Sequence, residues 1–229
     1  MKLVTWNTRH GGKRTDDKLD TAGLGKHLAS FNADIICLQE VEQDDGYGND
    51  DKVSKWLTAL GDGWRGVFVN LSGIVGGSGQ GNAILFKEDS SYSVYKLGLY
   101  DLRVALAVQF GNTFFVTTHL DNEAQKSRMV EMVQLLSWSV VHDAPKIVIC
   151  GDFNAGPTTP EMLPLGVLYN DASSYARAKT GLAYTHGKSS RIDYVFSKGM
   201  TPTLSYDVPD LKNVNGIYPS DHHPVIVTW

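Results

Sequence analysis

Cysteine is scarce in this chain and long apolar runs are missing. Only two cysteines occur among the 229 residues, Cys37 and Cys150, and both lie inside apolar runs. Free cysteine packs as a small hydrophobic residue, so we expect two buried, reduced thiols, with a disulfide as the alternative. No apolar run approaches the roughly 18 residues of a membrane helix, and the N-terminus lacks the pattern of a secretory signal. These absences predict no membrane span and make the cytoplasm the default location.

A basic excess is also lacking. The chain has 21 Lys and Arg against 25 Asp and Glu, for a net charge of −4 and a pI of about 5.9. This balance excludes a protein that coats nucleic acid through a generally basic surface. A nucleic-acid partner remains open because a bound metal ion can supply local positive charge, but binding without the metal should then be weak.

The length and the ordinary hydrophobic content of 42% predict one domain spanning residues 1–229, a monomer by default. Runs rich in Val, Ile, Phe and Thr predict strands at 2–7, 34–41, 66–70, 82–87, 93–100, 104–110, 113–120, 146–150, 191–197 and 224–229. Helical spacing of apolar residues appears around 24–31, 53–60 and 129–140. In the third segment we expect the stripe Met129, Met132, Val133, Leu136 and Val140 to pack in the core. Many strands with few helices favour two packed sheets with helices on their outer faces.

Residues 72–81 form a glycine-rich stretch. It lacks the Lys-Ser/Thr ending of a phosphate-binding P-loop, so we interpret it as a surface loop that borders the site.

Polar groups repeatedly follow apolar strands at the point where each strand ends. Residues 147–154 read Ile-Val-Ile-Cys-Gly-Asp-Phe-Asn, and residues 220–224 read Ser-Asp-His-His-Pro. One such residue alone is more often a turn residue than a functional one. Eight of them, mixing carboxylate, amide and imidazole, indicate a site: Asn7, Glu40, His119, Asp152, Asn154, Asp193, Asp221 and His222.

This mixture suits the hydrolysis of a phosphodiester. That reaction needs a hard cation on a phosphate oxygen, an activated water and a proton for the leaving oxygen. Mg²⁺ prefers carboxylate ligands and keeps several waters, whereas the Cys-x-x-Cys and histidine-rich clusters typical of zinc are missing. The sequence therefore predicts a phosphodiesterase that depends on Mg²⁺ or Mn²⁺.

The motifs resemble those of the endonuclease/exonuclease/phosphatase superfamily, which includes DNase I, abasic-site endonucleases and neutral sphingomyelinases. The similar segments are Thr-Trp-Asn, Leu-Gln-Glu-Val, Gly-Asn-Ala-Ile-Leu, Thr-His-Leu-Asp, Gly-Asp-Phe-Asn, Arg-Ile-Asp-Tyr-Val-Phe and Ser-Asp-His-His-Pro-Val. They span residues 5–225 in the family's order. The resemblance implies a four-layer α/β sandwich of two mainly antiparallel sheets flanked by helices, with the site at one edge of the sheets.

The resemblance also implies roles for these residues. Glu40 would be the main metal ligand, with Asn7 and Asp221 close to the ion. His222, oriented by Asp193, would activate water or bind the scissile phosphate. Which of His222 and Asp152 is the general base stays open, as does a second metal at Asp152. Asn154 would bind phosphate.

His119 separates branches of the superfamily, because the DNase I and sphingomyelinase branches use a histidine there to protonate the leaving group. Arg9 points the same way, since Asn-x-Arg resembles DNase I. The glutamate that supports this histidine in DNase I has no match here, and Asp121 is our substitute. Four further residues are interpreted either as substrate contacts or as ordinary structural groups: Arg9, Arg103, Arg128 and His186.

We therefore expect an endonuclease acting on DNA by in-line attack of water. A phosphodiesterase or phosphatase for a small or lipid phosphoester is the first alternative, and an abasic-site endonuclease is the second. A non-catalytic binding module is the hypothesis from another class. The complete set of site residues argues against it.

Overall fold

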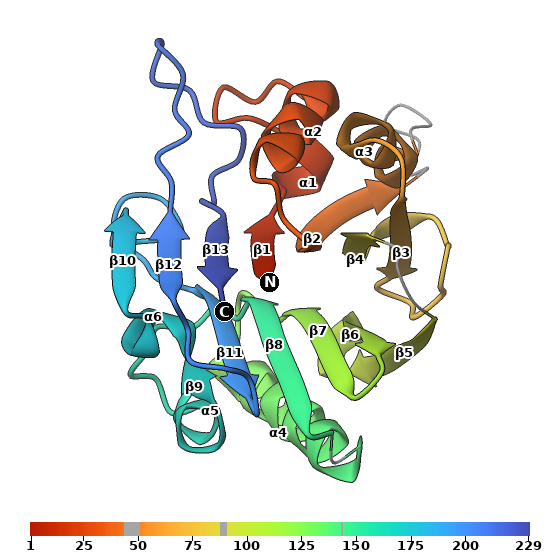
Figure 1. Ribbon diagram of the computed structural model, residues 1–229, viewed down its shortest axis with the longest axis vertical. Coiled ribbons are helices and arrows are strands. Elements are labelled where there is room, and N and C mark those ends of the chain that lie inside the picture. The colour runs from red at the N-terminus through yellow and green to blue at the C-terminus, as the bar shows by residue number, and fades with distance from the viewer. Residues whose placement is uncertain (44–50, 88–90, 143) are drawn as a thin grey trace.

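The computed structural model describes residues 1–43, 51–87, 91–142 and 144–229. Two β-sheets lie face to face, and the longer helices cover their outer faces (Figure 1). This arrangement confirms the predicted four-layer α/β sandwich. Most neighbouring strands are antiparallel, as expected, and the parallel pairs are β1 with β2, β7 with β8 and β10 with β12.

The first sheet has seven strands in the order β10-β12-β13-β1-β2-β4-β3. Their bounds are β10 Ala178–Gly181, β12 Ser205–Val208, β13 Val225–Thr228, β1 Lys2–Asn7, β2 Ile35–Gln43, β4 Gly79–Lys87 and β3 Trp64–Asn70. The second sheet has six strands in the order β5-β6-β7-β8-β11-β9. Their bounds are β5 Tyr92–Leu99, β6 Arg103–Phe110, β7 Thr113–His119, β8 Lys146–Asp152, β11 Asp193–Lys198 and β9 Asn170–Asp171.

Helices α2 (Thr21–Ser30) and α3 (Lys52–Leu60) cover the first sheet, and α4 (Gln125–His142) and α5 (Leu163–Leu168) cover the second (Figure 1). Two single turns, α1 (Arg9–Gly12) and α6 (Ala172–Tyr175), and the 3₁₀ turn η1 (Tyr100–Leu102) complete the elements. Aspartate side chains cap the starts of α2 and α3, because Asp20 and Asp51 accept the backbone N–H groups of Gly23 and Ser54. Within the described ranges, no helix combines the length and the apolar composition needed to cross a bilayer.

Three apolar cores separate the four layers, one between the sheets and one under each helical layer. Cys37 and Cys150 both lie in the central core with no exposed surface, and both are free thiols. The prediction of buried, reduced cysteines is therefore confirmed, and the alternative disulfide is absent.

The prediction for α4 is partly wrong. Met132 is buried, but Met129, Val133 and Val140 are 48%, 63% and 67% exposed. The buried face of this helix instead combines apolar side chains with polar ones: Ser127, Glu131, Met132, Leu135 and Ser139. Apolar spacing placed the stripe on the wrong side because polar residues occupy part of the face that packs on the sheet.

Strands β9, β10 and β12 were not predicted. They have two to four residues each, and every residue of β10 is exposed. β9 and β10 are short edge strands without an alternating apolar pattern, and β12 alternates over only four residues, so the sequence gives little sign of them.

Candidate active site

Strand ends from both sheets meet at one edge of the sandwich. In the second sheet, His119, Asp152 and Asp193 form one row across β7, β8 and β11. In the first sheet, Asn7 ends β1, and its amide nitrogen Nδ2 donates to Asp152 Oδ2 across the interface at 2.9 Å. Register therefore explains why residues distant in sequence lie together.

Asp152 lies at the centre of the cluster and is 1% exposed. Its Oδ2 atom is 3.5 Å from His119 Nε2 and 3.6 Å from His222 Nε2. Its Oδ1 atom accepts the backbone N–H of Asn154 at 2.9 Å. The Asn154 side chain donates to the Leu120 carbonyl, so one face of the amide is held by the backbone.

Glu40 lies next to Asn7 at an irregularity of β2. The pairing of β2 with β4 shifts register between Leu38 and Val41, and Glu40 has a φ of 51°. Asn7 Nδ2 donates to Glu40 Oε1 at 3.0 Å, and the His10 N–H donates to Oε2 at 3.2 Å. The bulge turns the carboxylate out of the strand pattern and towards the site edge.

Left-handed backbone is concentrated here. Arg9, His10, Glu40 and Asn154 all have φ values between 45° and 54°. A non-glycine residue in this region is uncommon and costs free energy, so surrounding contacts must hold it in place. Such strain is often found where a protein positions side chains for binding or catalysis.

Gly151 explains part of the Gly-Asp-Phe-Asn motif. Its φ is 132°, and a Cβ at this position would lie 2.0 Å from the Thr118 carbonyl oxygen. Only glycine allows β7 and β8 to approach this closely immediately before Asp152.

His222 is held from several sides. Its Nδ1 atom lies 2.9 Å from Asp193 Oδ2, and its carbonyl accepts the Trp6 indole N–H at 2.9 Å. The Ser220 hydroxyl accepts the His222 backbone N–H at 3.2 Å. The ring of His186 lies 4.5 Å from the His222 ring, centroid to centroid. These contacts fix the imidazole with Nε2 directed at Asp152.

Burial and neighbouring charges act in opposite directions on the pKa values of the site. Burial alone would raise the pKa of Asp152, but His222, His119 and the Asn7 amide bring it below its usual value. Burial alone would lower the pKa of His222, but Asp193 and Asp152 raise it well above its usual value. Burial lowers the pKa of His119 despite the nearby carboxylates of Asp152 and Glu40. His222 is therefore charged and His119 neutral at pH 7.

The donor set can hold a metal ion. Asp152, Asp193 and His222 offer ligand atoms within 4.8 Å of one another. Because His222 Nδ1 already contacts Asp193, a second arrangement fits a hard cation better. Glu40 Oε1 and Asp152 Oδ2 both accept from the same Asn7 amide nitrogen, which lies between them where a positive charge would be favoured.

Asp221 and Arg9 lie together at the edge of this cluster. The Asp221 side chain is 39% exposed, and its Oδ2 atom is 3.4 Å from Arg9 Nε. Arg9 also contacts Asp17 at 3.0 Å and donates to the Arg14 carbonyl. The structure thus brings both predicted residues to the site, with each already paired.

Arg103 and Arg128 lie on the His119 side. Arg103 donates to Asn122 at 3.0 Å, and it lies close enough to His119 to lower its pKa. Arg128 pairs with Glu161 at 2.9 Å and donates to the Asp121 carbonyl. Among the described residues, no contact joins Arg128 to the cluster around Asp152.

The suggested partner of His119 lies elsewhere. The Asp121 carboxylate accepts the N–H groups of Glu123 and Ala124 and lies 3.8 Å from Arg103. It therefore orients the start of α4 and Arg103, and within the described ranges no contact joins it to His119.

Sequence reasoning missed several supporting residues. Gln39 is fully buried, and its Nε2 donates to Thr5 and Thr117, one in each sheet. Thr185 accepts the Asp193 N–H through its hydroxyl, and Ser220 donates to the Asn7 carbonyl. Of these residues, only Ser220 could have been identified from the sequence, because it directly precedes the Asp-His pair.

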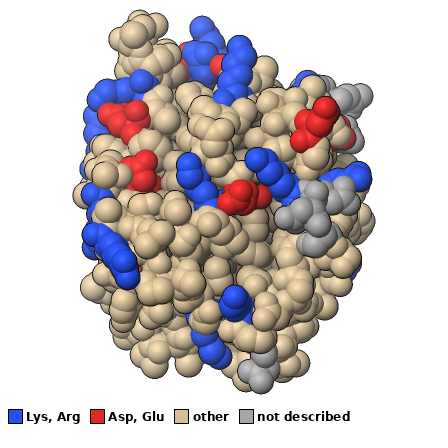
Figure 2. Space-filling model, in the orientation of Figure 1, with Lys and Arg blue, Asp and Glu red and all other residues tan. Residues whose placement is uncertain are grey.

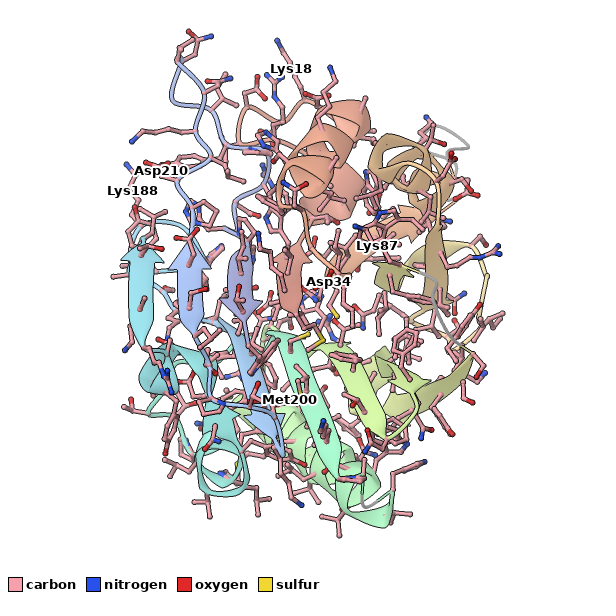
Figure 3. All side chains as sticks on the ribbon, viewed as in Figure 1. Lys18, Asp34, Lys87, Lys188, Met200 and Asp210 are labelled. Carbon is pink, nitrogen blue, oxygen red and sulfur yellow. The ribbon has the colours of Figure 1, made fainter. Side chains whose placement is uncertain are left out.

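A hollow of about 500 Å³ lies between the sheets at the end where β1 begins. Asp34, Lys87 and Met200 line it and can be followed in Figure 3. None of the predicted site residues lines this hollow, and Asn7, with the cluster around Asp152, lies at the opposite end of β1.

Comparison with known proteins defines the class. The model of the endonuclease/exonuclease/phosphatase family matches residues 4–222, and the chain belongs to this family of phosphoesterases. An exodeoxyribonuclease of Bacillus subtilis is 28% identical over 167 residues, which cover 67% of this chain and 58% of that protein. The chain thus matches less than two thirds of the length of that relative.

Solved structures agree on the fold. A family member from Bacteroides vulgatus superposes with a TM-score of 0.81 at 18% identity, covering 99% of this chain and 97% of that one. A mannosyl-6-phosphatase from Bacteroides thetaiotaomicron superposes with a TM-score of 0.78 at 16% identity, covering 100% and 98%.

Proposed function

We propose that this chain is a divalent-metal-dependent phosphodiesterase that hydrolyses nucleic-acid strands, with DNA as the first substrate. The convergence on Asp152 Oδ2 carries the proposal, because Asn7, His119 and His222 all reach this atom within 3.6 Å. The similarity to an exodeoxyribonuclease supports a nucleic-acid substrate.

Glu40, with Asn7 and Asp221 beside it, would hold Mg²⁺ or Mn²⁺, and Asp152 borders the same position. When bound, the ion supplies positive charge against the phosphate oxygens. For Asn7 to offer its carbonyl oxygen, its amide must turn over, because Oδ1 now accepts the Arg9 N–H.

Side chains of this chain take up the proton of the water and stabilise the charge on the phosphate. Asp152 is ionised at pH 7 and takes the proton of the attacking water, whose oxygen forms the new bond to phosphorus. The charged His222, held by Asp193, stabilises the negative charge that develops on the phosphate. The leaving oxygen departs opposite the water as its bond to phosphorus breaks.

His119 donates the proton that the leaving oxygen requires. It is neutral at pH 7 in the structure as it stands, because burial outweighs the neighbouring carboxylates. The negative phosphate of a substrate would favour its protonated form and so prepare it for this step.

A second candidate substrate is a small phosphoester, because the net charge of −4 leaves the chain without an excess of basic residues for a nucleic-acid strand. Figure 2 shows the face opposite the candidate site, where the Lys and Arg side chains of the described residues are interspersed with Asp and Glu. The fold shared with a mannosyl-6-phosphatase is compatible with this candidate.

Metal-dependent cleavage of supercoiled plasmid tests the proposal. The same reactions are run on an abasic-site duplex, sphingomyelin, mannose 6-phosphate and bis-p-nitrophenyl phosphate. Asp152→Asn should abolish turnover, whereas the matched control Asp62→Asn, in an exposed turn, should retain it. An intact plasmid with another substrate consumed would refute the nucleic-acid assignment. No turnover of any substrate with any divalent metal would refute the enzyme.

A further inference from the structure

A pocket of about 550 Å³ opens beside the active site and uses none of the groups assigned above. Its lining residues are His10, Lys13, Asp17, Leu19, Glu42 and Lys52. It joins the site directly, because the His10 N–H donates to Glu40 Oε2 and Asp17 contacts Arg9. A group bound here would therefore belong to the same molecule as the phosphate under attack.

Lys52 is the unusual member of this lining. It is the first residue of α3, and it is only 1% exposed. Across residues 1–43, 51–87, 91–142 and 144–229, no hydrogen bond or ion pair reaches its ammonium group. The Lys52 ammonium nitrogen is not among the buried polar atoms that lack a partner, and the residue lines the pocket, so an anion entering there would pair with this ammonium group.

The backbone is shaped to admit this side chain. Gly11 lies in the left-handed turn after Arg9, with a φ of 73°, and a Cβ there would lie 2.2 Å from Lys52 Cδ. The lysine stem thus occupies the space that any other residue at this position would fill. The strained turn and the start of α3 together build the pocket.

The other charged groups of the lining are engaged with one another. Lys13 lies 3.4 Å from Asp17, which also contacts Arg9, and His10 Nδ1 lies 2.6 Å from Glu42. Asp17 is thus paired with two cations, and Glu42 is in contact with the His10 ring. Lys52 remains as the cation whose charge is directed to a ligand.

We propose that this pocket binds a second phosphate of the substrate, with Lys52 as its cationic partner. The inference rests on the proposed function, since a phosphodiester is taken to occupy the adjacent site. The pocket has the volume of an ordinary small-molecule site, which accommodates a nucleotide unit. The second phosphate is either the neighbouring diester of a strand or a terminal monoester.

Kinetics on short oligonucleotides test this pocket. The wild-type protein is compared on TpT, pTpT, TpTp and TpTpT, which differ in the number and kind of phosphates. Loss of one charged hydrogen bond changes binding on the order of ten- to a hundredfold. We expect kcat/KM to be larger by about that factor with a second phosphate, and Lys52→Met to remove this ratio. Methionine retains much of the apolar stem, and thermal unfolding checks its fold.

Lys55→Met is the matched control, because it removes the same charge from the exposed side of α3 and should keep the wild-type ratio. A preference for pTpT or TpTp but not TpTpT identifies a terminal monoester, whereas a preference for TpTpT identifies the neighbouring diester. Equal kcat/KM values in the wild type, or a ratio unchanged in Lys52→Met, would overturn the pocket while leaving the proposed hydrolysis intact. Absence of metal-dependent hydrolysis of TpT and of bis-p-nitrophenyl phosphate would instead overturn the function.

Discussion

Replacing Glu131 with glutamine should stabilise the protein at neutral and higher pH. Glu131 lies on the buried face of α4 with no exposed surface. Its Oε2 atom accepts the Asp121 N–H at 2.9 Å, while Oε1 has no hydrogen-bond partner among the described residues. Burial raises the pKa of this carboxyl from 4.5 to about 7, outweighing the favourable Asp121 N–H bond and Arg103.

The raised pKa of Glu131 determines how the stability of the fold changes with pH. The unfolded chain holds the proton less tightly than the folded one, so folding is favoured below pH 4.5 and loses stability as pH rises to 7. A difference of about 2.5 pKa units, at about 1.4 kcal/mol each, corresponds to about 3 kcal/mol above pH 7. Glutamine has no charge to bury, so Glu131→Gln should escape this loss.

Urea unfolding followed by circular dichroism measures the effect. The stability advantage of Glu131→Gln over wild type should grow by about 2 kcal/mol or more between pH 5 and pH 8. Glu123→Gln, an exposed glutamate just before the same helix, is the control and should show no such growth. An advantage that is equal at both pH values would refute the assigned ionisation of Glu131.

Three further substitutions address the site. Glu40→Gln should weaken metal affinity more than it changes the fold, and an unchanged Mg²⁺ titration of activity would exclude Glu40 as a ligand. His222→Ala should lower kcat by on the order of 10²–10⁴ in steady-state assays, and an intact rate would refute its role. Gly151→Ala should destabilise the fold by about 2 kcal/mol or more and reduce activity, because the added methyl group meets the Thr118 carbonyl. If Gly151→Ala unfolded at the same denaturant concentration as the wild type, the predicted clash would be contradicted.

Much of the fold was predictable because its longer strands are buried and regular. All ten predicted strands are present, and the largest differences in their bounds are of a few residues. For example, β2 extends to Gln43 and β4 begins at Gly79. Burial on one or both faces leaves a strong apolar pattern in such strands. The apolar pattern predicted the wrong buried face for α4, because Ser127 and Ser139 occupy part of that face.

The candidate site was predictable to the extent that it lies at strand ends. His119, Asp152 and Asp193 meet because register aligns the ends of three adjacent strands. Lys52 could not be predicted, because its burial depends on a left-handed turn at Gly11 that packs against a helix beginning 41 residues later in the chain. Local patterns carry no information on such tertiary contacts.

Because the candidate site spans two sheets, its geometry depends on the relative position of those sheets. Gln39 connects the sheets just below the site, and its partners Thr5 and Thr117 each lie two residues before a site residue. One layer further out, the Asn7 amide connects Glu40 of the first sheet with Asp152 of the second. Because these side chains are buried, a shift of one sheet would leave polar atoms without partners, which is costly. The same hydrogen bonds that hold the sandwich together therefore also fix the separation of its two key carboxylates.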